Sequence, residues 1–413
     1  MAKNLILNEG YFNNKHFFDK GIGSNIFIKK KKFIDLSFGA GSLLLGHNSK
    51  VFKKAIKEVL NKKISLFANP NKQAEEFSKI LKKIFPFHSK FIFCSTGSEA
   101  IMKSLRIVKA ITNKEIIVNA TGSWHGSNDK TLFTANKNLI TKNLSEGLSK
   151  HDQKNFKFIP YNDIDKSKKI LDKLKRKISC ILIEPIQGSL PNINAINYIK
   201  FLNQYSKKNK IILIFDEMIT GLRIDASSFQ SKYGLKPDIA TFGKCFGGGL
   251  PIGIIALNKN IEKKIKKLKK KIFFGGTFSG NSLSTFIGKL TVNYIITNRK
   301  KIFRSLEDKS SLLFNKLNSI IKKEKINVSL YRFHSIFRII FTTKIVKNRT
   351  QRDFFEKKLY SNIVEFRKFL ISKKINYPSN GIIFISEQTS KKDINIILKY
   401  IRQGLIKFFK KKK

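Results

Sequence analysis

The sequence predicts an α/β protein whose large domain carries a mostly parallel sheet flanked by helices. Residues 211–215 read Ile-Ile-Leu-Ile-Phe, a continuous apolar run about as long as one strand. Such a run is typical of a parallel strand covered on both faces. Between about residues 89 and 257, short apolar runs alternate with helix-like segments, which favours helices on both sides of the sheet. A chain of 413 residues has room for two or three domains.

The elements follow one another in a regular order along the chain. Two apolar runs at residues 25–28 and 33–36 flank four lysines and predict a hairpin. Strands are predicted at residues 90–94, 116–118, 180–183, 211–215, 239–242 and 382–385. Helices are predicted at residues 51–62, 73–85, about 99–112, 164–175, 195–207, 261–271, 285–299 and 393–409. The strand at 90–94 is expected to be buried, residues 127–154 look polar and irregular, and residues 332–337 are expected to start a further strand.

The composition of the chain bears on membrane association, on secretion and on the redox environment of the protein. No apolar run approaches the roughly 20 residues needed to cross a bilayer, so no membrane association is expected. Residues 1–8 lack an extended apolar core and a cleavage site, so we expect no signal peptide. The three cysteines, Cys94, Cys180 and Cys245, are widely spaced and odd in number, which indicates a reducing cytoplasmic location and no metal site.

The formal charge of +54 raises the question of a nucleic-acid or acidic-membrane partner. The lysines are spread over the whole chain, and the 37 phenylalanines accompany many isoleucines and asparagines. This pattern is typical of an A+T-rich coding sequence, in which lysine is a frequent surface residue. We therefore expect no nucleic-acid partner. A basic nucleic-acid-binding protein on an inactive scaffold stays as a remote alternative, and it would require lysines clustered on one face.

Two predicted strands end in residues that carry chemistry. Asp216 follows the run 211–215, and Lys244 follows the run 239–242 just before a glycine-rich stretch. Ligands in open α/β sheets bind at such carboxyl ends. A lysine amine can form a Schiff base with an aldehyde cofactor, and pyridoxal phosphate (PLP) also needs an anion beside its pyridine nitrogen. We therefore take Lys244 as a candidate Schiff-base lysine and Asp216 as its pyridinium partner; the alternative is a solvated loop lysine.

A third strand end predicts an anion site. The run 90–94 leads into Ser95-Thr96-Gly97-Ser98 and then a helix. Free backbone N–H groups and the helix dipole both favour an anion at such a turn. The alternative is that Ser95 or Ser98 simply caps the helix, and one turn can do both.

The central block resembles one enzyme family. The stretch 216–223 (DEMITGLR), Pro237-Asp238, residues 241–244 (TFGK) and residues 247–253 (GGGLPIG) look like the class III (subgroup II) aminotransferases. Within that family, the sequence of these motifs is most similar to the glutamate-1-semialdehyde 2,1-aminomutase branch. The resemblance covers about residues 25–395. It implies a PLP-dependent transferase of fold type I, an aminotransferase (transaminase) or an isomerase of the aminomutase kind, working through a Lys244 Schiff base.

The resemblance also assigns residues around the cofactor. Gly97 and Ser98 occupy the positions that hold the PLP phosphate, while Trp124 would stack on the ring with His125 nearby. Ser189 stands where relatives place a polar neighbour of the cofactor's phenolic oxygen. Thr277 would bind the phosphate of the other subunit, which implies a homodimer with shared active sites. The stretch 127–154 corresponds to the family's active-site lid.

Domain boundaries follow from the same comparison. Residues 1–60 would form an N-terminal arm contributing to the small domain, 61–295 the large PLP-binding domain, and 296–413 the α+β C-terminal small domain.

Three departures from the aminomutase branch concern the substrate. The usual aromatic residue of the arm is replaced by Ala40, no arginine precedes Arg106, and residues 377–381 contain no carboxylate. Arg223 could bind a substrate carboxylate or be structural. The sequence therefore predicts an aminomutase-like enzyme acting on a small amino or keto substrate. The alternative is an aminotransferase of different specificity that moves an amino group from a donor to a ketone or aldehyde.

Overall fold

A computed structural model describes residues 17–410, and these form two compact units. Among the described residues, one unit comprises 17–49, 305–344 and 354–410, and the other comprises 50–304 and 345–353. The predicted absence of a signal peptide concerns residues 1–8, which lie outside the described part, as does the end of the lysine tail at 411–413. Within the described part, no helix is long and apolar enough to span a bilayer. The proposed domain boundaries stay a prediction.

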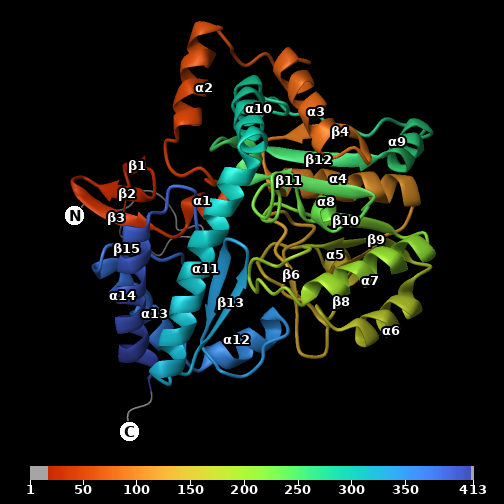
Figure 1. Cartoon of the computed structure of the whole chain (residues 1–413). Helices are drawn as coiled ribbons and strands as arrows, with labels where there is room; N and C mark the ends of the chain where they lie inside the picture. The colour runs from red at the N-terminus through yellow and green to blue at the C-terminus, as the bar shows by residue number, and fades with distance from the viewer. Residues whose placement is uncertain (1–16, 411–413) are drawn as a thin grey trace. The chain divides into compact units, whose positions relative to one another are not determined.

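The larger unit is built on a seven-stranded sheet in the order β4-β12-β11-β10-β9-β5-β8 (Figure 1). Its strands are β4 (His88–Cys94), β5 (Ile116–Ala120), β8 (Phe156–Ile159), β9 (Ile178–Ile183), β10 (Ile212–Asp216), β11 (Ile239–Gly243) and β12 (Gly253–Asn258). β8, β5, β9, β10 and β11 pair in parallel, whereas β12 runs antiparallel to both of its neighbours. The predicted mostly parallel sheet is thus confirmed.

Helices cover both faces of this sheet because alternate strand residues point to opposite sides. α4 packs on β12, β11 and β9, while α7 packs on β10 and α6 on β8 (Figure 1). Every residue of β10 and β11 is buried, as a strand covered on two faces requires. The helices of this unit are α2 (Lys50–Asn61), α3 (Lys72–Ile84), α4 (Gly97–Thr112), α5 (Lys150–Asn155), α6 (Ile164–Leu174), α7 (Ala195–Lys208), α8 (Phe229–Lys232), α9 (Lys259–Lys266) and α10 (Ser282–Thr297).

Three expectations for this unit differ from the structure in detail. β4 is only partly buried, because it lies at the edge of the sheet with β12 as its single strand neighbour. The helix expected at 261–271 already ends at Lys266. The lysines that follow would repel one another across a further helical turn. Residues 127–154 are also more ordered than expected, since they hold α5 and the hairpin β6 (Phe133–Ala135) and β7 (Thr141–Asn143).

The smaller unit contains two small sheets. β1 (Lys20–Ile22), β2 (Asn25–Ile28) and β3 (Lys31–Asp35) form an antiparallel meander, which confirms the predicted hairpin, and β15 (Ile375–Asn376) adds in parallel to β3. β13 (Ser329–Phe333), β14 (Ile336–Ile340) and β16 (Ile382–Phe384) form the second sheet. The stretch 332–337, expected to start a strand, contains the end of β13, a turn at His334 and the start of β14 at Ile336. The turn forms where His334 adopts a left-handed backbone conformation.

The remaining elements are helical. They are the short turn α1 (Phe38–Gly41), α11 (Arg299–Lys323), α12 (Arg349–Lys357), α13 (Tyr360–Ser372) and α14 (Lys391–Phe409). α11 and α12 each contain residues of both units, so the chain passes between the units within these helices.

Candidate active site

Asp216 and Lys244 leave the sheet from neighbouring parallel strands. In the register of β10 and β11, Asp216 lies opposite Thr241, and Lys244 follows directly after the end of β11. The structure therefore brings the two strand ends together, as the sequence predicts. Both residues lie in the larger unit, at the edge where ligands of open α/β sheets bind.

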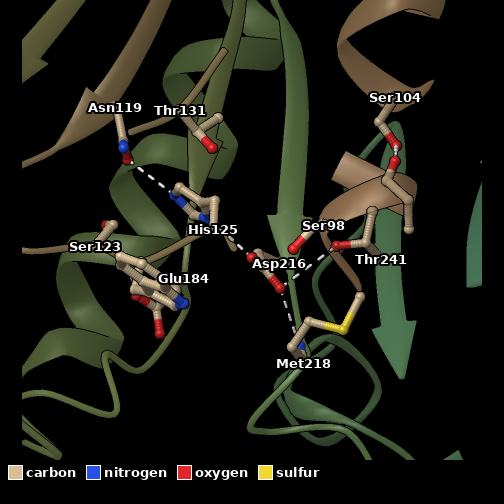
Figure 2. A network of polar contacts seen from close by, with 12 residues as sticks. Ser98, Ser104, Asn119, Ser123, His125, Thr131, Glu184, Asp216, Met218 and Thr241 are labelled. Carbon is tan, nitrogen blue, oxygen red and sulfur yellow. Dashed lines mark hydrogen bonds and ion pairs between the residues drawn. The ribbon is translucent and has the colours of Figure 1, made fainter. Parts of the chain in front are cut away.

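The Asp216 carboxylate is buried and held by three donors. His125 Nδ1 donates to Oδ2 at 2.7 Å, and Oδ1 accepts from Met218 N at 3.1 Å and from Thr241 Oγ1 at 3.5 Å. His125 Nε2 lies 3.1 Å from Asn119 Oδ1, so the imidazole bridges Asn119 and Asp216 (Figure 2). This network fixes the orientation of the carboxylate.

Asn119 is itself held in place, because its Oδ1 accepts the backbone N–H of Ala120 at 2.7 Å. The His125 imidazole is therefore oriented from both sides, by Asn119 and by Asp216.

Lys244 has the features of a reactive amine. Its φ of 47° lies in the left-handed region, a strained conformation of the kind that accumulates at functional sites. Burial lowers the pKa of the Lys244 ammonium, although the negative charges of Asp216 and Glu184 oppose this shift. Within residues 17–410, no hydrogen bond or ion pair joins Lys244 Nζ to another group. The amine is thus positioned without being neutralised by a partner.

The predicted anion site is present at the start of α4. Thr96 caps this helix by accepting the N–H of Glu99 at 3.2 Å, so the expected cap at Ser95 or Ser98 is wrong. Ser98 Oγ instead accepts the backbone N–H of Ser127 at 3.0 Å. Gly97 and Ser98 occupy the first helical turn, where N–H groups lack helical partners. The turn can therefore bind a phosphate.

Glycines make close packing around this turn possible. A Cβ on Gly97 would lie 2.8 Å from Met218 Sδ, and a Cβ on Gly126 would lie 2.9 Å from Ser98 Cα. Gly126 also has a φ of 85°. The loop that carries Trp124 and His125 thus approaches the anion turn more closely than a larger residue would allow.

The loop before Gly126 is fastened to the end of β9. Trp124 N donates to Glu184 Oε1 at 2.7 Å, and Ser189 Oγ donates to Gly122 O at 3.2 Å. Figure 2 shows Glu184 beside Ser123. Burial raises the pKa of Glu184 to about 7, and the charge of nearby Asp216 adds to this effect while His125 opposes it. Trp124 is itself 43% exposed, which leaves part of this aromatic residue accessible to a ligand.

Thr277 is the one predicted site residue that does not join this group. It lies exposed in the loop between α9 and α10, together with Phe273 and Phe278, which are 75% and 56% exposed. This loop is anchored from behind by α4, since Lys103 Nζ donates to Phe274 O at 2.6 Å. The Thr277 side chain is therefore accessible to a second molecule.

Sequence reasoning missed two residues of the site and left a third undecided. Asn119 gave no signal, because a polar residue near the end of a strand is unremarkable in sequence. Glu184 did carry a signal, since it directly follows the buried strand β9. Arg223 is 1% exposed, and its Nη2 lies 3.9 Å from Cys245 Sγ, which favours a packing role over substrate binding.

Comparison with known proteins agrees with this geometry. The profile of the family described as Aminotransferase class-III matches residues 9–351. The chain belongs to the class-III aminotransferase family. The predicted family, the fold and the enzyme class, a PLP-dependent aminotransferase or aminomutase, are thereby confirmed.

Several relatives carry one name. A glutamate-1-semialdehyde 2,1-aminomutase of Archaeoglobus fulgidus is 33% identical over 326 residues, which cover 78% of this chain and 77% of the relative. A protein of the same name from Fusobacterium nucleatum is 28% identical over 400 residues, covering 96% and 91% of the two chains.

Solved structures share the fold at low sequence identity. An omega-transaminase from Sphaerobacter thermophilus superposes with a TM-score of 0.86 at 19% identity, covering 94% of this chain and 90% of the other. A glutamate-1-semialdehyde-aminomutase from Pseudomonas aeruginosa PAO1 gives a TM-score of 0.84 at 16% identity, with 95% and 88% covered.

Proposed function

We propose that this enzyme binds PLP through Lys244 and moves amino groups in the manner of a glutamate-1-semialdehyde 2,1-aminomutase. The observation that carries the proposal is the Lys244 amine, which burial makes less basic and which has no hydrogen-bonding partner in its own unit, at a strand end beside a buried carboxylate. The relatives named as aminomutases support the choice of reaction.

The residues present fit PLP on three sides. The start of α4 would hold the phosphate through the N–H groups of Gly97 and Ser98. Asp216 would hold the protonated pyridine nitrogen, and the accessible part of Trp124 would cover the ring. Ser189 would lie by the phenolic oxygen. Bound PLP would supply an electron sink for negative charge on the carbon next to the substrate nitrogen.

The chain's own residues would handle charge and protons. Lys244 Nζ would take a proton from the substrate carbon and return it elsewhere, and a lowered pKa keeps more of this amine uncharged near neutral pH. Because His125 holds the Asp216 carboxylate in place, that negative charge need not reorganise as the reaction proceeds. Loop 121–126 and the end of β9 would exclude water from one side of the ring.

Two further parts of the proposal concern assembly and location. Thr277 would reach the phosphate of a second copy, so the working enzyme would be a homodimer. Its exposed position and the neighbouring Phe273 and Phe278 support this arrangement. We also place the enzyme in the cytoplasm, and the three free, buried cysteines support a reducing compartment.

An aminotransferase of different specificity is the second candidate. The missing arginine before Arg106, Ala40 and the absence of a carboxylate in 377–381 all favour it, because these positions concern the substrate rather than PLP. The two candidates differ in stoichiometry. An aminomutase forms product from glutamate-1-semialdehyde alone, whereas an aminotransferase needs a separate donor and acceptor.

The first test is an absorbance spectrum of the purified protein with added PLP. We expect a band at about 420 nm, as for a PLP–lysine conjugate, and its loss in Lys244→Ala. Lys259→Ala serves as control because the Lys259 side chain is 64% exposed. A wild type without the band, or a Lys244→Ala variant that keeps it, would refute PLP binding through Lys244. Product from the semialdehyde alone then selects the mutase, and dependence on an added donor selects the aminotransferase.

A further inference from the structure

A segment far along the chain supplies arginines to the edge of the candidate active site. Residues 345–353 belong to the larger unit, although the residues on both sides of them belong to the smaller one. The first turn of α12 lies in this segment and contains Arg349 and Arg352. These cations are of interest because the sequence lacks the early arginine that the aminomutase branch uses for the substrate carboxylate.

Arg349 packs directly on the loop that carries Trp124. A Cβ on Gly122 would lie 2.5 Å from Arg349 Cβ and 3.4 Å from its Cδ, so only a glycine at position 122 leaves room for this side chain. Gly122 also has a φ of 87°, which favours glycine there. Trp124 follows two residues later on the same loop. The base of the Arg349 side chain is thus held against the loop that carries Trp124.

Arg352 donates hydrogen bonds from all three of its side-chain nitrogens, whereas Arg349 donates from one. Arg352 is 5% exposed; its Nη1 donates to Ser189 O at 2.6 Å, and its Nε donates to Asp353 Oδ1 at 2.9 Å. Arg349 donates only from Nε, to Asp353 Oδ2 at 3.3 Å, and its side chain is 33% exposed. Across the described residues, neither Nη group of Arg349 has a hydrogen-bonding partner.

The local charge and hydrogen bonding favour an anion. Two arginines share the single carboxylate of Asp353, which leaves one net positive charge at this point. Gln187 Oε1 lies 3.1 Å from the same Cβ position on Gly122 and, in the described part of the chain, is buried without a donor. It can accept an N–H of Arg349 when that side chain turns from Asp353 towards a ligand.

We propose that Arg349 binds the carboxylate of the substrate, with Arg352 and Asp353 as positioning residues. The paired Nη groups of a guanidinium match the two oxygens of a carboxylate and give a bidentate contact. The site therefore selects amino or keto acids over neutral amines and carbonyl compounds. This inference rests on the proposed function for the identity of the pocket, but carboxylate binding itself can be measured without catalysis.

The test uses the fluorescence of Trp124, which is the single tryptophan of the chain. The protein, with and without added PLP, is titrated with propionate and glutarate, which carry no amino group, and with the corresponding carboxamides. We expect the carboxylates to change the emission and the carboxamides to bind much more weakly. In Arg349→Met the carboxylate dissociation constants should rise roughly 10- to 100-fold, as expected for hydrogen bonds to a charged group. Lys347→Met removes the same charge from an exposed position two residues away and should behave as wild type.

The outcomes separate this inference from the proposed function. If Arg349→Met keeps its preference for carboxylates over carboxamides, or if no carboxylate binds the wild type, the role of Arg349 is refuted. If carboxylates bind through Arg349 but PLP gives no lysine-linked band, the proposed function fails while the anion site stands. Thermal unfolding of both variants checks that the fold is unchanged.

Discussion

Lys103 is the residue whose replacement should reveal most about how the site is supported. It lies inside α4 and is 2% exposed, which is unusual for a lysine. Its ammonium lies 2.5 Å from Glu99 Oε1 and donates to Phe274 O at 2.6 Å and to Ser279 Oγ at 3.2 Å. Lys103 therefore ties the helix of the anion turn to the loop that carries Thr277.

The expected cost of Lys103→Met follows from these contacts. Methionine fills a similar volume but leaves Glu99 without its cation and Phe274 O without its donor. Burial alone would raise the pKa of Glu99, and the hydrogen bonds from Lys103 and Ser95 bring it below its ordinary value. Removing one partner of a buried ion pair typically lowers the free energy of unfolding by about 3–5 kcal/mol. Because the Glu99 side chain keeps 22% exposure, we expect the lower end, about 3 kcal/mol.

Urea denaturation with a double-mutant cycle checks this value. Lys109→Met is the matched control on the same helix, because its ion pair with Glu115 is partly exposed and should be worth under about 1 kcal/mol. Glu99→Gln should recover part of the loss when combined with Lys103→Met, since it removes the unpaired charge. A cost below about 1 kcal/mol for Lys103→Met, or no coupling to Glu99, would refute the reasoning.

Three further predictions concern other parts of the chain. Gly126→Ala should weaken PLP binding at least roughly tenfold in a spectroscopic titration, because its Cβ would displace Ser98 and its φ of 85° disfavours alanine. Burial lowers the pKa of His88 to about 4, so His88 stabilises the fold above pH 6.5, and that stability is lost as the pH falls through 4. Relative to His88→Gln, wild type should lose about 3 kcal/mol over this range, measured by urea unfolding at each pH. Phe278→Asp should shift a dimer towards monomer in sedimentation velocity, since it places a charge on the exposed loop.

Each of these predictions has its own control. Gly234 has a φ of 64° but open space around its Cβ, so Gly234→Ala should spare PLP binding, and an equal loss in both variants would contradict a specific role for Gly126. An unchanged pH dependence in His88→Gln would show that His88 titrates normally in the fold. Phe354→Asp, at a residue that is 74% exposed, is the control for an added surface charge. If the wild-type protein is already a monomer in sedimentation velocity, the dimer proposal is refuted.

The sequence predicts the central strands well because their cause is local. Every residue of β10 and β11 is buried, and the largely apolar sequences 211–215 and 239–242 predict this burial directly. The chemistry at Asp216 and Lys244 is equally visible, because strand ends project their residues to one edge. The edge position of β4 could not be predicted in this way, since strand order is set by pairing with residues more than a hundred positions away.

The same limit applies to residues whose surroundings come from distant parts of the chain. Lys103 reads as a surface lysine in a lysine-rich sequence, but Phe274 and Ser279 arrive about 170 positions later to bury it. The role proposed for Arg349 likewise depends on its packing against Gly122, a residue far away in the sequence. Such contacts leave no local periodicity, so a single sequence carries no trace of them.

The interleaving of the two units has a consequence for synthesis. β3 near the N-terminus pairs with β15, and the two strands are separated by more than 300 residues. At ordinary elongation rates, the ribosome makes β15 on the order of tens of seconds after β3. The sheet of β1, β2 and β3 therefore lacks its fourth strand while the larger unit is synthesised. A nascent chain stopped before residue 375 would expose the unpaired edge of β3 to chaperones or to other chains.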